Sequence, residues 1–185
     1  MTNANEKVWI ACEGFSWGKV CLAATQKGLI QVLLGSSLKD LKPFVLRKAP
    51  GAQFIEDPRM LKESLAWFRL YSESPEKCGK RPSLDMRGTD FELRVWKALA
   101  RVKHGELVTY GELAARAHCP SPRAVGQAVG RNPLAVVIPC HRVIAANQGL
   151  GGFSGGLDIK IRLLRHEGVE VDETRKKVLA LRQDM

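Results

Sequence analysis

Several features of membrane, secreted and low-complexity proteins are missing from this chain of 185 residues. No apolar run approaches the roughly 20 residues that a membrane-spanning helix needs. Residues 1–7 lack the charged-then-apolar pattern of a secretory signal, so we expect a cytoplasmic protein with no membrane partner. There is no internal repeat, and a composition of 45% apolar and 26% charged residues is ordinary for a globular protein.

Cysteine pairs of the kind that bind zinc are also missing. The five cysteines are irregularly spaced and include no CxxC pair, so we expect no metal and no cofactor. An odd number of cysteines without a secretion signal argues against a disulfide framework. Cys12 and Cys21 lie in apolar stretches, where we expect them to pack as small buried hydrophobes.

Acidic residues are few relative to basic ones. The chain has 19 acidic and 29 basic residues, which gives a net charge of +10 and a pI near 9.6. A small protein with this charge often has a polyanionic partner such as nucleic acid. A merely basic surface would give the same arithmetic, so charge alone does not decide between them.

The first half of the chain has the pattern of a small α/β (α+β) domain. Short apolar runs predict strands over 7–12, 19–25 and 29–34. The turn at 26–28 makes a hairpin of the last two strands. Helical spacing predicts a helix over 58–71, and a polar loop follows it. We therefore place an N-terminal domain with a small β-sheet at 1–87.

The second half is predicted to be mainly α-helical, with a C-terminal domain at 88–170. Thr89 and Glu92 have the spacing of a capping box at the start of a helix. Two further helices, over 111–118 and 122–130, are separated by a short turn and form a helix-turn-helix. Residues 171–185 form a basic tail, in which we expect a helix over 172–182.

Cys140 has different neighbours from the other cysteines. His141 and Arg142 follow it directly, and such neighbours favour the thiolate, which is the nucleophilic form. Glu167 lies at the end of an apolar helix that Gly168 closes. Its carboxylate is suited to orient a histidine, as in nucleophile–base–orienter triads.

A glycine-rich loop over 149–156 lies between Cys140 and Glu167 in the sequence. Its backbone amides can approach a flat ligand closely, but it lacks the GKS or GKT of a phosphate loop. A cysteine–histidine pair, a glycine-rich loop and a glutamate at a helix end each have an ordinary structural explanation. Their occurrence together, beside a helix-turn-helix in a basic protein, favours a functional site.

The segment Pro139-Cys140-His141-Arg142-Val143 resembles the active-site signature of the O6-alkylguanine-DNA alkyltransferases, also called methylated-DNA–protein-cysteine methyltransferases. The resemblance covers residues 88–170. Further matching segments, in family order, are Val108-Thr109-Tyr110, Arg123-Ala124-Val125-Gly126, Asn132-Pro133, Ser154-Gly155-Gly156-Leu157 and His166-Glu167-Gly168.

The resemblance implies DNA repair by direct reversal of damage. An alkyl group moves from O6 of guanine to the protein's own Cys140, and the protein is spent in one turnover. The implied partner is double-stranded DNA carrying O6-alkylguanine, bound at the minor groove with the damaged nucleotide flipped out. We expect a monomer. The range of alkyl groups, transfer from O4 of thymine and cooperative association on DNA stay open.

The resemblance also implies roles for individual residues. Cys140 is the nucleophile, His141 is its base through a water molecule, and Glu167 orients His141. Tyr110 donates a hydrogen bond or proton to N3 of the departing guanine. Arg123, which opens the recognition helix, fills the stack that the flipped nucleotide leaves.

Further residues are implied to bind the substrate or hold the site. Asn132 holds the turn before Pro139 through backbone hydrogen bonds, and Ser154 contacts O6. The carbonyls of Val143 and Cys140 read the exocyclic amine of guanine. Phe153, where some relatives carry tyrosine, and Gly155 belong to the same substrate-binding loop. Some relatives bind zinc in the N-terminal domain, which we do not carry over to this chain.

Three other functions fit parts of the sequence. A non-catalytic relative that flags alkylated bases would replace the nucleophilic cysteine, whereas Cys140 is present. A cysteine hydrolase would explain Cys140, His141 and Glu167 but neither the helix-turn-helix nor the charge. A transcriptional regulator would leave the segment around Cys140 without a role.

Overall fold

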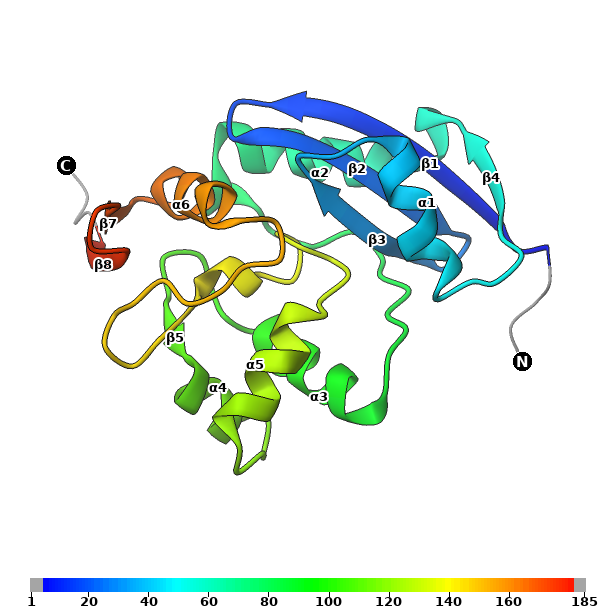
Figure 1. Cartoon of the computed structure of the whole chain (residues 1–185). Helices are drawn as coiled ribbons and strands as arrows, with labels where there is room; N and C mark the ends of the chain where they lie inside the picture. Colours follow the sequence, from blue (N-terminus) through cyan, green and yellow to red (C-terminus); the bar gives the residue numbers. More distant parts are fainter. Residues whose placement is uncertain (1–4, 182–185) are drawn as a thin grey trace. The chain divides into compact units, whose positions relative to one another are not determined.

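The computed structural model describes residues 5–181 and divides the chain into two compact units, Met1–Arg87 and Gly88–Met185 (Figure 1). Both units contain helices and small sheets, as predicted for a mixed α/β protein. In the part of the chain that the structure describes, no helix is long and apolar enough to cross a membrane.

The first unit is built on a four-stranded sheet with the order β3-β2-β1-β4. Its strands are β1 (Lys7–Phe15), β2 (Gly18–Thr25), β3 (Gly28–Leu34) and β4 (Gln53–Glu56). The predicted hairpin is the antiparallel pair of β2 and β3, with Gly28 at a φ of 136°. The sequence analysis missed β4, which pairs parallel to β1.

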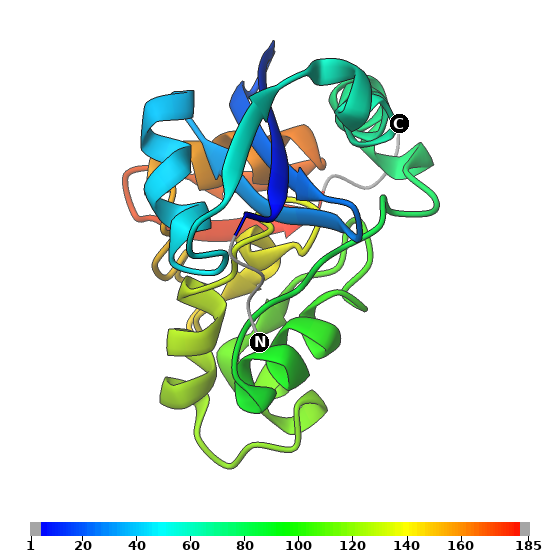
Figure 2. The ribbon, with the colours of Figure 1, turned by 90° about the vertical axis from the view of Figure 1, so that its right-hand side faces the viewer.

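Helices cover both faces of this sheet, α1 (Leu38–Leu46) one face and α2 (Lys62–Glu73) the other (Figures 1 and 2). The short 3-10 helices η1 (Pro58–Leu61) and η2 (Pro75–Lys77) flank α2. The sequence analysis missed α1, which Ser37 and Asp40 begin with a capping box. Under α1 lies a core of buried side chains: Val8, Ile10, Cys21, Ala23, Ile30, Leu41, Val45 and Ala49.

The prediction that Cys12 and Cys21 are separate buried thiols is wrong, because the structure joins them in a disulfide. The two residues lie directly opposite each other in the antiparallel pair of β1 and β2. Cross-strand partners have neighbouring Cβ atoms, so two cysteines at such positions are within reach of each other. The strand prediction stopped at residue 12 and included no pairing of β1 with β2, so this contact was not foreseen.

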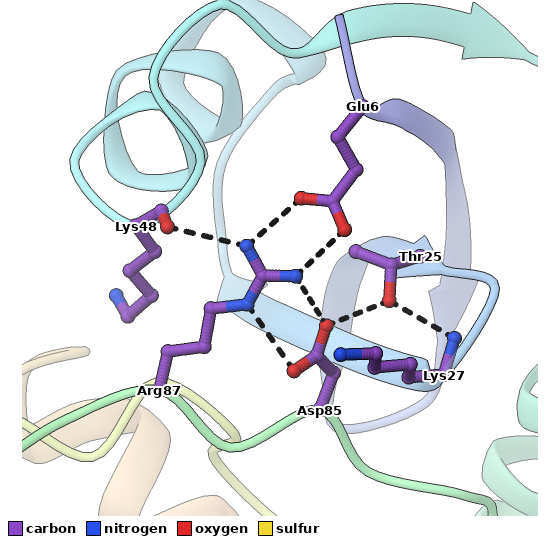
Figure 3. A network of polar contacts seen from close by, with 6 residues as sticks. All are labelled: Glu6, Thr25, Lys27, Lys48, Asp85 and Arg87. Atoms are coloured by element: carbon purple, nitrogen blue, oxygen red, sulfur yellow. Dashed lines mark hydrogen bonds and ion pairs between the residues drawn. The ribbon is translucent and has the colours of Figure 1, made fainter. Parts of the chain in front are cut away.

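A polar network fixes the end of the first unit to its sheet (Figure 3). Arg87 makes paired hydrogen bonds to Glu6, at 2.8 Å each, and its Nη2 lies 2.6 Å from Asp85 Oδ2. Thr25 donates to the same carboxylate at 2.7 Å, and the N–H of Asp85 donates to the carbonyl of Leu29. The segment that leads out of the unit is therefore held along the edge of β3.

The second unit carries four helices among its described residues: α3 (Asp90–Leu99), α4 (Tyr110–Arg116), α5 (Pro122–Gly130) and α6 (Leu157–His166). The predicted capping box of Thr89 and Glu92 begins α3. Trp96 of α3 donates its indole N–H to the carbonyl of Ala128 at 2.8 Å, which ties α3 to α5. The observed α5 has the bounds that the sequence predicted, with Ser121 as its N-cap.

Two short sheets complete this unit. The strands β5 (Val108–Thr109) and β6 (Val143–Ile144) pair in parallel, and β6 follows the 3-10 helix η3 (Cys140–Arg142). The strands β7 (Val169–Asp172) and β8 (Lys177–Leu181) form an antiparallel hairpin. The predicted helix over 172–182 is therefore wrong up to residue 181, and residue 182 lies outside the described residues.

Candidate active site

Cys140 lies at the start of η3, buried at the end of an apolar loop. Asn132 shapes this loop, because its side-chain amide donates to the carbonyl of Ile138 at 2.8 Å and accepts from the N–H of Leu134 at 3.0 Å. The Asn132 side chain also hydrogen-bonds Cys140. These hydrogen bonds join Asn132 to both ends of the loop that leads to Pro139 and Cys140.

His141 and Glu167 meet in the buried interior, with His141 Nε2 2.9 Å from Glu167 Oε1. Arg142 holds the same carboxylate with two hydrogen bonds, at 2.8 and 2.7 Å, and donates a third to the carbonyl of Val102. Among the described residues, the Nδ1 atom of His141 has no hydrogen-bond partner. With Nε2 facing the carboxylate, Nδ1 is the ring nitrogen that can exchange a proton with another group.

Burial and charge set opposite protonation preferences in this cluster. Burial raises the pKa of Glu167, but His141 and Arg142 outweigh it and hold that pKa far below its usual range. Burial is also the main cause that lowers the pKa of His141, so the ring is neutral near pH 7. The site therefore pairs a permanent carboxylate with an imidazole that is free to accept a proton.

The sequence predicts that His141 and Arg142 favour the thiolate of Cys140, but in the structure burial acts in the opposite direction and has the larger effect. Burial raises the pKa of the Cys140 thiol. Arg142 does not compensate, because its guanidinium is bound by Glu167 and faces that carboxylate. Cys140 is thus a thiol at rest, and it needs a base to become a nucleophile.

Lys160 of α6 is a buried cation that the sequence analysis missed. Its Nζ donates to the carbonyl of Val143 at 2.6 Å and to the carbonyl of Leu150. Burial lowers the pKa of Lys160 to about 8, and the charge of Lys160 in turn lowers the pKa of Cys140. The sequence held a signal for this residue, because Lys160 lies at helical spacing from Leu157 and Leu164 on the apolar face of α6.

A cavity of about 320 Å³ opens above Cys140. Its lining residues are Tyr110, Gly126, Val129, Gly130, Cys140, Gly152, Phe153 and Ser154. A volume of this size suits a small organic ligand. Burial raises the pKa of Tyr110, so its phenol keeps its proton and can donate it to a ligand.

The structure thus gathers most of the predicted site residues, but at different depths. Tyr110, Phe153 and Ser154 line the cavity with Cys140, while His141 and Glu167 are buried. The remaining positions lie around this centre: Asn132 behind the loop, Val143 in β6, and Gly155, where an added Cβ would lie 2.9 Å from Phe153 Cε1. Arg123 is exposed on the first turn of α5 and does not line the cavity.

No group of three or more histidine, cysteine or acidic side chains that could hold a metal ion is found among residues 5–181. The polar groups in and near the cavity include a cysteine thiol and, next to it in sequence, a neutral histidine that can accept a proton. Fold and site together define a protein that presents a buried cysteine to a ligand-sized cavity beside a pair of short helices.

Comparison with known proteins identifies this arrangement. Residues 90–169 match the family model of the DNA-binding domain of 6-O-methylguanine DNA methyltransferase. A methylated-DNA–protein-cysteine methyltransferase of Methanosarcina acetivorans is 42% identical over 144 residues, covering 74% of this chain and 91% of the relative. The chain belongs to the methylated-DNA–protein-cysteine methyltransferase family, which confirms the family and the enzyme class predicted from the sequence.

Solved structures agree. An O6-methylguanine methyltransferase of Mycobacterium tuberculosis superposes with a TM-score of 0.73 at 32% identity, covering 91% of this chain and 94% of that one. The Mycobacterium tuberculosis protein named OGT, solved in complex with DNA, has a TM-score of 0.70 at 32% identity, with 87% and 92% covered.

Proposed function

We propose that this protein repairs O6-alkylguanine in DNA by moving the alkyl group onto Cys140 in a single, irreversible turnover. The observation that carries the proposal is that Cys140 lines the cavity and is followed directly by a neutral histidine whose other ring nitrogen faces a carboxylate. Among the described residues that line the cavity, Cys140 contributes the one thiol, and its alkylation leaves a stable thioether.

The proton moves before or with the alkyl group. Glu167 accepts from Nε2–H of His141, so Nδ1 is the nitrogen that takes the proton of the Cys140 thiol through a water molecule. The positive charge that forms on the imidazole is stabilised by Glu167. The ammonium of Lys160 stabilises the thiolate of Cys140. Arg142 does not, since its charge is balanced by Glu167.

The transfer itself exchanges one bond for another. The sulfur of Cys140 forms a bond to the alkyl carbon while the bond from that carbon to O6 breaks, and the guanine leaves with the electron pair. Tyr110 donates a proton or a hydrogen bond to N3 of the guanine, which stabilises the leaving base. Ser154 contacts O6. The carbonyl of Val143, which already accepts from Lys160, uses its second lone pair to accept from the exocyclic amine.

DNA binds through α4 and α5, used as a helix-turn-helix at the minor groove. Two small, half-buried residues, Ala124 and Gly126, follow the exposed Arg123 in α5, and they permit close approach to a narrow groove. O6 lies on the base-pairing and major-groove edge of guanine, out of reach of a protein bound in the minor groove, so the nucleotide must flip out to reach a buried thiol. Arg123 is exposed at the N-terminal end of α5, and it fills the gap in the base stack that the flipped nucleotide leaves.

The direct test is the mass of the intact protein after incubation with duplex DNA that contains O6-methylguanine. The wild-type protein should gain one methyl group on Cys140, located by peptide mapping. Cys140→Ser should gain none and still bind DNA, whereas Cys119→Ser is a matched control that should react normally. A methyl group found on another cysteine of the wild-type protein would contradict the assignment.

The role of Arg123 is tested by comparing duplex DNA with the free base O6-benzylguanine, which needs no flipping. Arg123→Ala should slow transfer from the duplex far more than transfer from the free base. Arg123→Lys keeps the charge and loses the planar group, so it should restore only part of the rate. Full rescue by lysine would reduce Arg123 to a phosphate contact.

A further inference from the structure

The hairpin of β7 and β8 lies almost wholly beyond the family model's match, which ends at residue 169. Strand β8 pairs with β7 along one edge. Along the other edge, Gly149 of the glycine-rich loop forms an antiparallel bridge with Lys177. The hairpin therefore uses a strand edge to hold the start of the loop that lines the cavity.

Two backbone hydrogen bonds flank that bridge. The N–H of Val178 donates to the carbonyl of Gln148, and the N–H of Leu150 donates to the carbonyl of Lys176, both at 2.9 Å. This alternation is that of an antiparallel ladder. Residues 148–150 thus pair with β8 through one bridge and two hydrogen bonds, and their position depends on where β8 lies.

Leu150 is held by its side chain as well as by its backbone. Its carbonyl accepts from Lys160, and its side chain is 1% exposed. That side chain belongs to a cluster of buried residues from β6, the glycine-rich loop, α6 and the hairpin. Its members are Ile144, Leu150, Ile161, Leu164, Val169, Val171 and Val178. Since Val171 and Val178 are cross-strand partners in the hairpin, they pack the cluster from the hairpin side.

The loop turns from Leu150 directly onto the cavity. Gly151 has a φ of 66°, and a Cβ at this position would lie 2.9 Å from the Tyr110 hydroxyl oxygen. The backbone of Gly152 hydrogen-bonds the Tyr110 side chain, and both Gly152 and Phe153 line the cavity. A shift at Leu150 would therefore move the cavity wall and the phenol that faces it.

We propose that the C-terminal hairpin is a positioning element for the substrate cavity. It acts through the N–H of Val178 and the carbonyl of Lys176, which set the glycine-rich loop against Tyr110. The expected effect on alkyl transfer rests on the proposed function. The hydrogen-bonded contact between residues 148–150 and β8 does not depend on it.

The test removes one backbone hydrogen-bond donor of β8 and leaves the rest of the hairpin sequence unchanged. Val178→Pro removes the N–H that bonds Gln148, whereas Val178→Ala keeps it and loses only side-chain packing. We expect faster amide hydrogen–deuterium exchange over residues 148–154 in Val178→Pro than in Val178→Ala. Transfer from O6-benzylguanine free base should fall by roughly 10-fold or more in Val178→Pro, because a shift of about 1 Å can cost 10²-fold in rate. Affinity for undamaged duplex DNA should not change.

A second pair of variants loosens the hairpin at its turn. Asp172 accepts a hydrogen bond from the N–H of Arg175 at 2.9 Å. Asp172→Ala should therefore speed exchange over residues 148–154 and slow transfer, both less than Val178→Pro does. Asp172→Asn keeps an acceptor and should show wild-type exchange and transfer. These variants decide the question if Val178→Pro does not fold. Unchanged exchange over 148–154, or faster exchange with a wild-type transfer rate, would overturn the inference. A wild-type protein that accepts no alkyl group would instead refute the proposed function. The exchange data would still show whether the hairpin holds residues 148–154 in place.

Discussion

Each unit of this protein contains an arginine bound by carboxylates, but the two clusters lie at different depths. In the Arg87 cluster, Glu6 and Asp85 hold an arginine whose side chain is 23% exposed. In the Arg142 cluster, Glu167 holds an arginine that is 8% exposed and shares the carboxylate with His141. Glu167 itself is 1% exposed, and the ring of His141 is fully buried.

The difference in depth changes what each cluster can do. Near the surface, water competes for the charges and an ion pair adds little to stability. In the interior, desolvation costs several kcal/mol per ion, and a well-packed apolar replacement is often more stable. The Arg142 cluster is therefore poorly explained by stability alone, and its neutral histidine beside a cysteine points to proton transfer.

The largest expected effect is on folding, from removing one arginine in each cluster. Arg142→Met leaves the carboxylate of Glu167 buried without its main partner, which should cost about 3–5 kcal/mol. Arg87→Met exposes two carboxylates that water can reach, and should cost about 1 kcal/mol. Urea unfolding at pH 7 measures both. Equal losses would show that depth does not distinguish the clusters.

The next effect is on rate, from Glu167→Gln. A glutamine can donate its amide N–H to Nε2 of His141, and this favours the tautomer with the proton on Nδ1, where it cannot accept one from Cys140. We expect the single-turnover transfer rate to fall on the order of 10²-fold. Asp85→Asn in the Arg87 cluster is the matched control and should leave the rate unchanged. A wild-type rate in Glu167→Gln would leave Glu167 as a structural helix-end residue.

The third effect is a pH dependence that the buried Lys160 should produce. Its pKa is about 8 in the folded protein against 10.5 in the unfolded chain, so the unfolded chain binds more protons in between. Stability should therefore rise with pH through this window, by on the order of 1–2 kcal/mol between pH 8 and pH 9.5, as the burial penalty of the ammonium is relieved. Lys160→Met should lose this rise, measured as the difference between the two proteins. The same rise in both would assign it to other groups.

Local signals in the sequence predicted the elements that local chemistry determines. Ser121 and Pro122 mark the start of α5, the Thr89 capping box marks α3, and a turn glycine marks the hairpin of β2 and β3. The string around Cys140 and the position of Glu167 led to the partners that the structure brings together. The helix starts and the hairpin turn depend on neighbours in sequence, which a single chain reveals, whereas the pairing of His141 with Glu167 across 26 residues was implied by the family resemblance.

Features set by distant packing were not predictable in this way. Residues 172–182 have a composition that suits a helix, yet Val171 and Val178 pack as strand partners against the α6 core, and Lys176 adopts a φ of 51°. The resting thiol of Cys140 depends on burial and on an arginine that faces elsewhere. Tertiary context overrode local preference in both cases.

The smallest expected effect tests the shallow cluster by itself. Burial raises the pKa of Asp85, but the hydrogen bonds from Arg87 and Thr25 outweigh it, so the folded pKa is lower than the unfolded one. A carboxylate of this kind stabilises the fold above its unfolded pKa and loses that contribution as pH falls through the folded value. Thr25→Val removes the 2.7 Å bond at nearly constant side-chain volume, and should cost about 1 kcal/mol at pH 7. The loss should shrink as the pH is lowered toward 3, because protonated Asp85 no longer needs the donor. A loss that is the same at both pH values would mean that the hydroxyl serves the turn at Lys27, whose N–H it accepts, rather than the carboxylate.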